Sequence, residues 1–217
     1  MNTNLGESVI VPVDGKSVWG DLILVPGATG LVLFAYGSGS SRFSERERFV
    51  SGKLNEAGIS TFFIDLLTRE EEETDILTRE YRFNIPLLAE RLASALEWAK
   101  KGHRTKELRM GMFGGSTGAS ACLVAAAKER LGVSAVVSRG GRTDLADEVL
   151  PQVTAATLLI VGGKDSGILD INQQSLGLLG CKKKKLEIVA GATHLFEEPG
   201  ALERVAWLAE RWFKVHL

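Results

Sequence analysis

The chain has 217 residues, of which 45% are hydrophobic, and its 26 basic and 27 acidic side chains leave a formal net charge of −1. A chain of this length can bury roughly 70% of the surface that it exposes when unfolded, so we expect one domain over residues 1–217. The balanced charge lacks the basic excess that neutralises a phosphate backbone, which argues against a nucleic-acid partner.

The amino-terminal stretch MNTNLGESVIVPV has no charged start followed by a long apolar region. No later segment approaches the roughly 18 uninterrupted apolar residues that a membrane span needs, so we expect no membrane association. Cys122 and Cys181 stand in contexts typical of free thiols in a reducing compartment. The three histidines lack paired ligand spacing, so we expect no metal. Together these features predict a cytoplasmic protein.

The chain opens with two short apolar segments, SVIVPV and SVWGDLILV, on either side of the turn dipeptide Asp14-Gly15. This pattern predicts an antiparallel hairpin at the edge of a sheet. Six further apolar runs follow, and longer amphipathic segments separate most of them. These runs are residues 31–36, 60–65, 108–113, 134–139, 157–162 and 185–190. We therefore expect an α/β fold, with a mostly parallel twisted sheet and helices on both of its faces.

Several helical segments carry start signals. Ser44 is followed three positions later by Glu47, which predicts a capping box at the start of a helix. Pro86 stands near the start of a segment with helical periodicity, where its missing N–H costs little. The charged stretch 68–80, TREEEETDILTRE, lies between a strand and a helix, and we expect a solvated loop, a short helix or a small lid there.

The stretch Gly114-Gly115-Ser116-Thr117-Gly118 fits the pattern G-x-S-x-G between a predicted strand and a predicted helix. A serine on so tight a turn adopts a strained backbone, and its small neighbours let other backbone segments approach closely. The start of the following helix would direct free N–H groups toward a developing negative charge. An isolated match of this kind is as typical of a turn needed only for packing, so the rest of the chain decides between the two.

A candidate acid and a candidate base follow the next strands. Asp165 comes just after the run 157–162, and His194 comes just after the run 185–190. Because the carboxyl ends of parallel strands share one edge of a sheet, we expect both side chains near Ser116. A neutral imidazole there can accept the serine proton, and a carboxylate stabilises the imidazolium that forms. Asp170, in a predicted helix, is the alternative acid.

Two backbone N–H groups are expected to stabilise the negative charge of a tetrahedral intermediate. One is that of Thr117, and the other is that of Ser38 in the loop YGSGSS after the first parallel strand. A flexible glycine–serine turn is the alternative for this loop. Four arginines in predicted loops near the same edge could pair with a substrate carboxylate, or form salt bridges to the Glu70–Glu73 run or to Asp144. They are Arg42, Arg82, Arg139 and Arg142.

The strings YGSGSS, GGSTG, GGKD and GATH, placed in this order on successive strand ends, resemble the α/β-hydrolase superfamily over nearly the whole chain. The longer strings HLFEEPGALE, PLLAERL and SRGGRTDLA resemble the small bacterial dienelactone-hydrolase-like proteins. The resemblance implies a fold with little or no cap and hydrolysis of a small carboxylic ester without a cofactor. It also implies Ser116 as nucleophile, Asp165 as acid and His194 as base.

The chain departs from that family at two positions. Dienelactone hydrolases proper use cysteine as the nucleophile, whereas position 116 is serine, which favours a general esterase-like role. Lactones and thioesters are neighbouring possibilities. Many relatives carry histidine where this chain has Tyr36, so we expect Tyr36 to brace the oxyanion loop differently, to leave it imperfectly formed, or to contact substrate.

Two further functions remain as alternatives. The first is a protein that keeps the hydrolase fold but binds or regulates with weak or no catalysis, which the tyrosine at position 36 motivates. The second is a nucleotide-binding oxidoreductase. The sequence disfavours it because the G-x-G-x-x-G spacing fails both in the stretch around Ser116 and in the loop after Tyr36.

Overall fold

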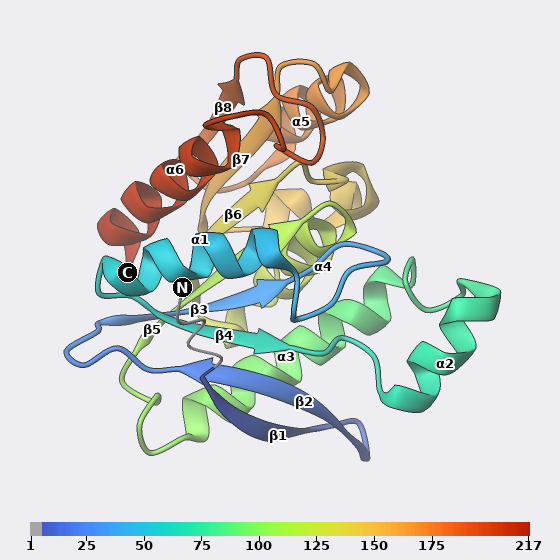
Figure 1. Cartoon of the computed structure of the whole chain (residues 1–217), viewed down its shortest axis with the longest axis vertical. Helices are drawn as coiled ribbons and strands as arrows, with labels where there is room; N and C mark the ends of the chain where they lie inside the picture. Colours follow the sequence, from blue (N-terminus) through green and yellow to red (C-terminus); the bar gives the residue numbers. More distant parts are fainter. Residues whose placement is uncertain (1–5) are drawn as a thin grey trace.

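The computed structural model describes residues 6–217 as an eight-stranded sheet flanked by helices (Figure 1). The spatial order of the strands is β1-β2-β4-β3-β5-β6-β7-β8. The strands are β1 (Glu7–Val13), β2 (Lys16–Ile23), β3 (Gly30–Ala35), β4 (Ser60–Ile64), β5 (Arg109–Gly115), β6 (Val133–Arg139), β7 (Ala156–Gly162) and β8 (Lys184–Val189). The first five residues, which begin the amino-terminal stretch MNTNLGESVIVPV, lie outside the described residues.

The predicted hairpin and the mostly parallel sheet are both confirmed. β1 and β2 pair antiparallel, β2 pairs antiparallel with β4, and all pairs from β4 to β8 are parallel. Asp14 and Gly15 both take positive φ, 47° and 70°, which is the geometry that a tight two-residue hairpin turn requires. Every residue of β3 and of β7 is buried, because helices cover both faces of the sheet.

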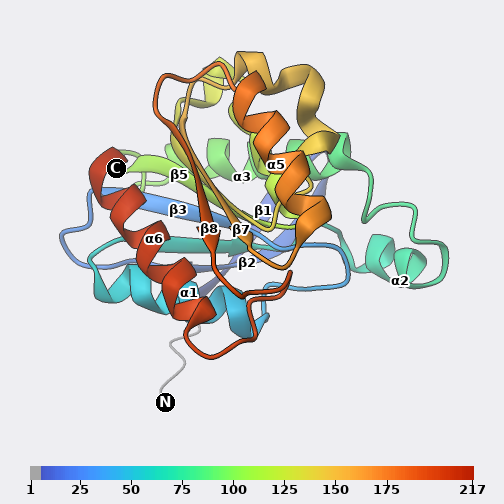
Figure 2. The ribbon, with the colours of Figure 1, turned by 90° about the horizontal axis from the view of Figure 1, so that it is seen from above.

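The helices form two layers, one on each face of the sheet (Figure 2). The α-helices are α1 (Glu45–Glu56), α2 (Arg69–Thr78), α3 (Ile85–Lys101), α4 (Thr117–Ala126), α5 (Ser166–Leu178) and α6 (Ala201–His216). There are also two 3₁₀ segments, η1 (Glu129–Leu131) before β6 and η2 (Thr143–Gln152) after it. α1 and α6 pack together on one face, while α3, α4 and α5 lie on the other. Each layer has its own apolar core, so the sheet is held from both sides.

The start of α1 shows one difference from the sequence expectation. The helix begins at Glu45, directly after Ser44, but the predicted capping box between Ser44 and Glu47 is wrong. The Ser44 hydroxyl donates to the Glu47 carboxylate instead of accepting a backbone N–H. The Ser44 N–H is already bonded to the Ser41 carbonyl oxygen at 3.0 Å, and Arg139 binds the other carboxylate oxygen of Glu47. Glu47 therefore faces the interior.

The stretch 68–80 forms the short helix that was one of its three predicted outcomes. α2 stands away from the body of the molecule in both views, between β4 and α3 (Figures 1 and 2). A reciprocal capping box begins it: the Glu71 N–H donates to the Thr68 hydroxyl at 3.3 Å, and the Thr68 N–H donates to the Glu71 carboxylate at 2.9 Å. α3 then begins with Pro86 in its first turn, as predicted.

Three further features concern the described residues 6–217. None of their helices combines the length and apolar character needed to cross a bilayer. They contain no group of three or more His, Cys, Asp or Glu side chains arranged to hold a metal ion. Cys122 and Cys181 are buried free thiols, and burial raises the pKa of the Cys122 thiol.

Candidate active site

Ser116 occupies the turn between β5 and α4 with φ 50° and ψ −120°, a conformation that residues other than glycine rarely adopt. Three backbone hydrogen bonds hold it there, one of them donated by the Ala119 N–H to the Ser116 carbonyl oxygen at 3.2 Å. The Ser116 N–H donates to the Arg139 carbonyl oxygen at 3.1 Å, and the Arg142 N–H donates to the Ser116 carbonyl oxygen at 3.1 Å. Strain of this kind persists only where the surroundings fix it, and it is concentrated at functional sites.

The glycines around Ser116 are required by close backbone contacts. A Cβ atom on Gly118 would lie 2.4 Å from the Ala35 carbonyl oxygen, and one on Gly114 would lie 2.5 Å from the Ala119 Cα. Gly37 also packs closely, because a Cβ there would lie 2.9 Å from the Ser116 Cβ. The loop after β3 and the start of α4 therefore approach each other at backbone distance, and larger residues would force them apart.

Asp165 and His194 form a pair at the same edge of the sheet. Asp165 follows β7, His194 follows β8, and the imidazole Nδ1 lies 2.6 Å from the Asp165 Oδ2. The Lys164 N–H donates to the Ala192 carbonyl oxygen at 2.9 Å and so joins the two loops. The imidazole is 37% exposed and the carboxylate 17%, so the ring is reachable from solvent while its partner is largely covered. Asp170 lies in α5 with an exposed side chain.

Gly140 lies between the backbone that binds Ser116 and the side chain of His194. It follows Arg139, whose carbonyl oxygen binds the Ser116 N–H. A Cβ on Gly140 would lie 3.3 Å from both Cε1 and Nδ1 of His194, so the imidazole packs directly on this glycine. Within residues 6–217 no hydrogen bond joins the Ser116 hydroxyl to the imidazole. Bonds of this kind are often long in ligand-free enzymes and tighten only with bound substrate.

The two expected oxyanion donors, Ser38 and Thr117, lie next to each other. The Ser38 N–H donates to the Thr117 hydroxyl at 2.9 Å, and Thr117 is the first residue of α4. This bond ties the loop after β3 to the turn that carries Ser116. It also means that a side-chain oxygen already occupies one expected donor. The motif gave no sign of this bond, although a threonine directly after the serine is a residue able to form it.

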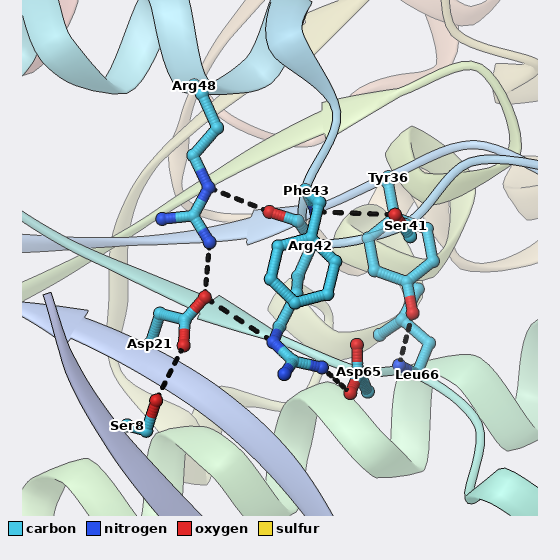
Figure 3. Close-up of polar contacts among 9 residues, drawn as sticks. All are labelled: Ser8, Asp21, Tyr36, Ser41, Arg42, Phe43, Arg48, Asp65 and Leu66. Carbon is cyan, nitrogen blue, oxygen red and sulfur yellow. Dashed lines mark hydrogen bonds and ion pairs between the residues drawn. The ribbon is translucent and has the colours of Figure 1, made fainter. Parts of the chain in front are cut away.

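A polar network holds the loop after β3 from behind (Figure 3). The Leu66 N–H donates to the Tyr36 hydroxyl at 2.9 Å, so the phenol connects the end of β3 to the segment after β4. Burial, and secondarily the carboxylate of Asp65, raises the pKa of Tyr36, which keeps the phenol neutral. Arg42 pairs with Asp65 and lies 3.4 Å from Asp21. Tyr36 and Arg42 thus brace the loop.

Asp65 has a pKa raised to about 6. Burial is the main cause, and the neighbouring carboxylates of Glu72 and Asp21 add to it. The ion pair with Arg42 acts in the opposite direction but does not cancel the effect of burial. The carboxyl at this position therefore changes its charge in mildly acidic solution.

The other candidate arginines are also paired within the chain. Arg82 Nε lies 2.6 Å from the Asp75 carboxylate, and Arg142 binds Asp144 through two contacts of 2.9 Å. Arg139 is buried and binds Glu47 at 2.6 Å. Arg142 thus binds Asp144, which was one of the two partners suggested by the sequence. The other suggested partner, the Glu70–Glu73 run, binds none of the four, because Arg42, Arg82 and Arg139 pair with carboxylates outside it.

A cavity of about 820 Å³ opens beside this arrangement. Residues of the loop after β3 line it, together with Glu72, Asp75 and Ile76 of α2. Thr117, next to Ser116, and Glu197, three residues after His194, also line it. The cavity therefore reaches both loops that carry the candidate nucleophile and base. Its lining combines serine hydroxyls and charged groups with the apolar side chains of residues such as Phe43 and Leu66.

Known structures share this fold. A dienelactone hydrolase from Anabaena variabilis is 52% identical, with a TM-score of 0.95 and 97% of each chain covered. Est1E from Butyrivibrio proteoclasticus, at 14% identity and a TM-score of 0.80 over 96% of this chain and 98% of that one, shares the fold. No family model matches the chain.

Curated relatives are longer proteins. Two from Mycobacterium tuberculosis, named provisionally as phosphoribosyl transferases, are 50% identical over 211 residues, which make up 97% of this chain and 46% of theirs. The chain thus spans about half the length of the curated relatives that it matches.

Proposed function

Because the chain belongs to the dienelactone-hydrolase-like family of the α/β-hydrolase superfamily, we propose that it is a serine hydrolase that cleaves a small carboxylic ester through an acyl-enzyme on Ser116. The observations that carry this proposal are the strained Ser116 turn after β5 and the His194–Asp165 pair, whose imidazole packs on Gly140 at the end of the neighbouring strand β6. A partly buried serine on such a turn, together with a carboxylate-bound imidazole at the same sheet edge, fits nucleophilic catalysis.

The proposed reaction proceeds in two halves. The His194 Nε2 accepts the proton of the Ser116 hydroxyl while the serine oxygen attacks the ester carbonyl carbon. Asp165 holds Nδ1 and stabilises the imidazolium. The imidazolium then protonates the leaving alcohol, and the C–O bond of the ester breaks to leave the acyl-enzyme. A water molecule, deprotonated by His194, attacks the acyl carbon, and the serine leaves with its proton restored.

The oxyanion of each tetrahedral intermediate would be bound by the N–H groups of Thr117 and Ser38. The Ser38 N–H is bonded to the Thr117 hydroxyl at 2.9 Å, so we propose that this hydroxyl rotates aside when the oxyanion forms. One such donor contributes about 3 kcal/mol of transition-state stabilisation. Thr117→Val removes the hydroxyl and keeps the branched shape. It therefore separates the role of the Thr117 hydroxyl, which accepts the Ser38 N–H, from the proposed role of the Thr117 backbone N–H as an oxyanion donor.

The cavity beside α2 would hold the bulkier part of the substrate. Its volume of about 820 Å³ suits a small organic ester. All four candidate arginines are already paired to carboxylates of the chain, which favours a neutral ester over an anionic one. Lactones and thioesters remain within the proposed class, because the same acyl transfer cleaves them. If charge on the acid portion of an ester raises kcat/KM, and Arg82→Ala removes that effect, the substrate is anionic instead.

The test is turnover of p-nitrophenyl acetate by wild type, Ser116→Ala and His194→Ala. We expect measurable hydrolysis by wild type and a loss of at least about 10³-fold in kcat in each variant. Circular dichroism should show that each variant keeps the wild-type fold. Turnover that survives Ser116→Ala would remove the nucleophile assignment. A folded wild type without turnover on esters, lactones or thioesters would favour the alternative, a binding protein that keeps the hydrolase fold.

Phosphoribosyl transfer is a second candidate, because half of each longer protein bearing that name is 50% identical to this chain. We expect it to belong to the remaining part of those proteins, since the arrangement of Ser116, His194 and Asp165 suits acyl transfer. Incubation with phosphoribosyl pyrophosphate and a panel of free bases should release no pyrophosphate. Release that persists in Ser116→Ala would assign transfer to this chain.

A further inference from the structure

Arg139 and Glu47 form an ion pair that is almost completely removed from solvent. Their side chains are 6% and 2% exposed, and Arg139 Nη2 donates to Glu47 Oε1 at 2.6 Å. Taking two charges out of water costs several kcal/mol for each ion, and apolar residues of similar volume often give equal or greater stability. Stability alone therefore explains this pair poorly, and its surroundings suggest another role.

The pair lies directly beneath the turn that carries Ser116. A Cβ on Gly115, the residue before Ser116, would lie 2.6 Å from Arg139 Nη2 and 3.1 Å from Glu47 Oε1. The carbonyl oxygen of Arg139 also accepts the Ser116 N–H at 3.1 Å. Arg139 thus supports the nucleophile twice, through its backbone on one side and through its guanidinium on the other.

The same pair reaches the other two segments of the site. Glu47 belongs to the first turn of α1, directly after the loop that contains Ser38, and its carboxylate accepts the Ser44 hydroxyl. On the opposite side, the Arg139 guanidinium carbon lies 5.8 Å from the centroid of the Phe196 ring. Phe196 is buried two residues after His194 and takes φ 56°. One ion pair therefore contacts the end of the loop after β3, the turn that carries Ser116 and the loop that carries His194.

We propose that the Arg139–Glu47 pair is a positioning element that fixes Ser116, the oxyanion loop and His194 relative to one another. Arg139 then acts through Ser116 and does not bind substrate. The inference rests on the proposed hydrolase function, because it assigns these two residues to the geometry of that reaction. Catalytic groups must be held within a fraction of an ångström, so a small relaxation of this support lowers kcat.

The experiment compares Arg139→Met/Glu47→Gln with wild type and with Arg139→Lys. The double variant leaves no unpaired buried charge, so it should fold even if Arg139→Met alone does not. Active sites are titrated with a fluorophosphonate, and kcat per titrated site and KM are measured with p-nitrophenyl acetate. We expect kcat per site to fall about tenfold or more in the double variant, with KM changed less than about twofold. Arg139→Lys, which keeps the charge, should recover part of the loss.

Lys128→Met/Glu90→Gln serves as a control for loss of an ion pair elsewhere, because it removes a more exposed pair between the segment after α4 and α3, away from these loops. It should leave kcat per site unchanged. An unchanged kcat per site in Arg139→Met/Glu47→Gln, with only Tm lowered, would show a merely structural pair and overturn the inference. A raised KM with kcat intact would instead assign Arg139 to substrate binding. A wild type without turnover or labelling would overturn the proposed function as well, which distinguishes the two failures.

Discussion

The turn around Ser116 and the helix α2 border the same cavity but are built differently. At the turn, backbone packs on backbone: Gly118 and Gly114 leave no room for a Cβ, and the strained serine is held by three main-chain hydrogen bonds. α2 stands away from the sheet (Figure 1), and its side chains Ile76 and Leu77 are 66% and 84% exposed. The candidate chemistry thus lies on the tightly packed part.

Polar contacts, and little apolar burial, attach α2 to the body. Glu71 binds Lys16 and the buried Arg91, each through Oε1, at 2.7 Å and 2.8 Å. At the other end, the Asp75 carboxylate accepts the Arg82 side chain at 2.6 Å. The difference between the two regions indicates a division of work: changes at the turn should alter kcat and stability, whereas changes on the cavity face of α2 should alter KM.

The largest expected effect concerns the acid at the packed edge. Asp165→Asn should lower kcat for p-nitrophenyl acetate by about 10³- to 10⁴-fold, because the amide no longer holds the imidazole in the productive tautomer. Asp170→Asn, five positions further along in α5, should leave kcat unchanged. Equal losses in the two variants would make the Asp165–His194 contact irrelevant to activity.

The packing at the turn is tested by one glycine substitution and its control. Gly118→Ala would place a Cβ 2.4 Å from the Ala35 oxygen and 2.6 Å from the Tyr36 oxygen, both backbone atoms. We expect a loss of about 1–3 kcal/mol in the free energy of unfolding, which urea titration measures. Gly52→Ala, in α1 with no atom within 4 Å of the added Cβ, should stabilise by about 0.5–1 kcal/mol. A neutral Gly118→Ala would mean that the turn is not tightly packed.

Asp65, which lies in the chain between β4 and α2 and pairs with Arg42, leads to a prediction about pH. Its folded-state pKa, about 6, exceeds the ordinary 3.8 mainly because of burial, so the folded protein binds this proton more tightly than the unfolded chain. The resulting stability is fully present below about pH 4 and is lost as the pH rises through 6. Between pH 4 and pH 7, the free energy of unfolding of wild type should fall by on the order of 2–3 kcal/mol more than that of Asp65→Asn. Parallel pH curves from urea titrations would contradict this.

The smallest effect is expected on the exposed side. Ile76 lines the cavity from α2, whereas its neighbour Leu77 is more exposed. Ile76→Ala should raise KM about two- to fivefold for an ester that fills the cavity, with kcat unchanged, because only apolar contact with bound substrate is lost. Leu77→Ala should change neither constant. A fall in kcat for Ile76→Ala would show that α2 also shapes the catalytic geometry.

The sequence was sufficient where structure follows from local pattern. The hairpin at Asp14-Gly15, the buried parallel strands and the tight turn at Ser116 were all readable, because turn chemistry and strand periodicity are encoded within a few neighbouring residues. The order Ser116, Asp165, His194 predicted a common edge, and the structure pairs the last two.

Contacts between side chains that are distant in the sequence could not be predicted from it. Glu47 looked like a helix cap because the local spacing matched, but Arg139, 92 positions away, binds its carboxylate. Arg42 similarly binds Asp65 across the sheet edge, and the Tyr36 hydroxyl accepts the N–H of Leu66. A periodic pattern says which face a side chain occupies but not which charge it meets there, so the polar support of the site required coordinates.

The proposed activation of Ser116 by His194 can be checked by mapping a fluorophosphonate adduct with peptide mass spectrometry. We expect one modified residue, Ser116, in wild type, and an adduct at least about 10³-fold slower to form in folded His194→Ala. Modification of another residue, or labelling of Ser116 at the same rate without His194, would contradict it.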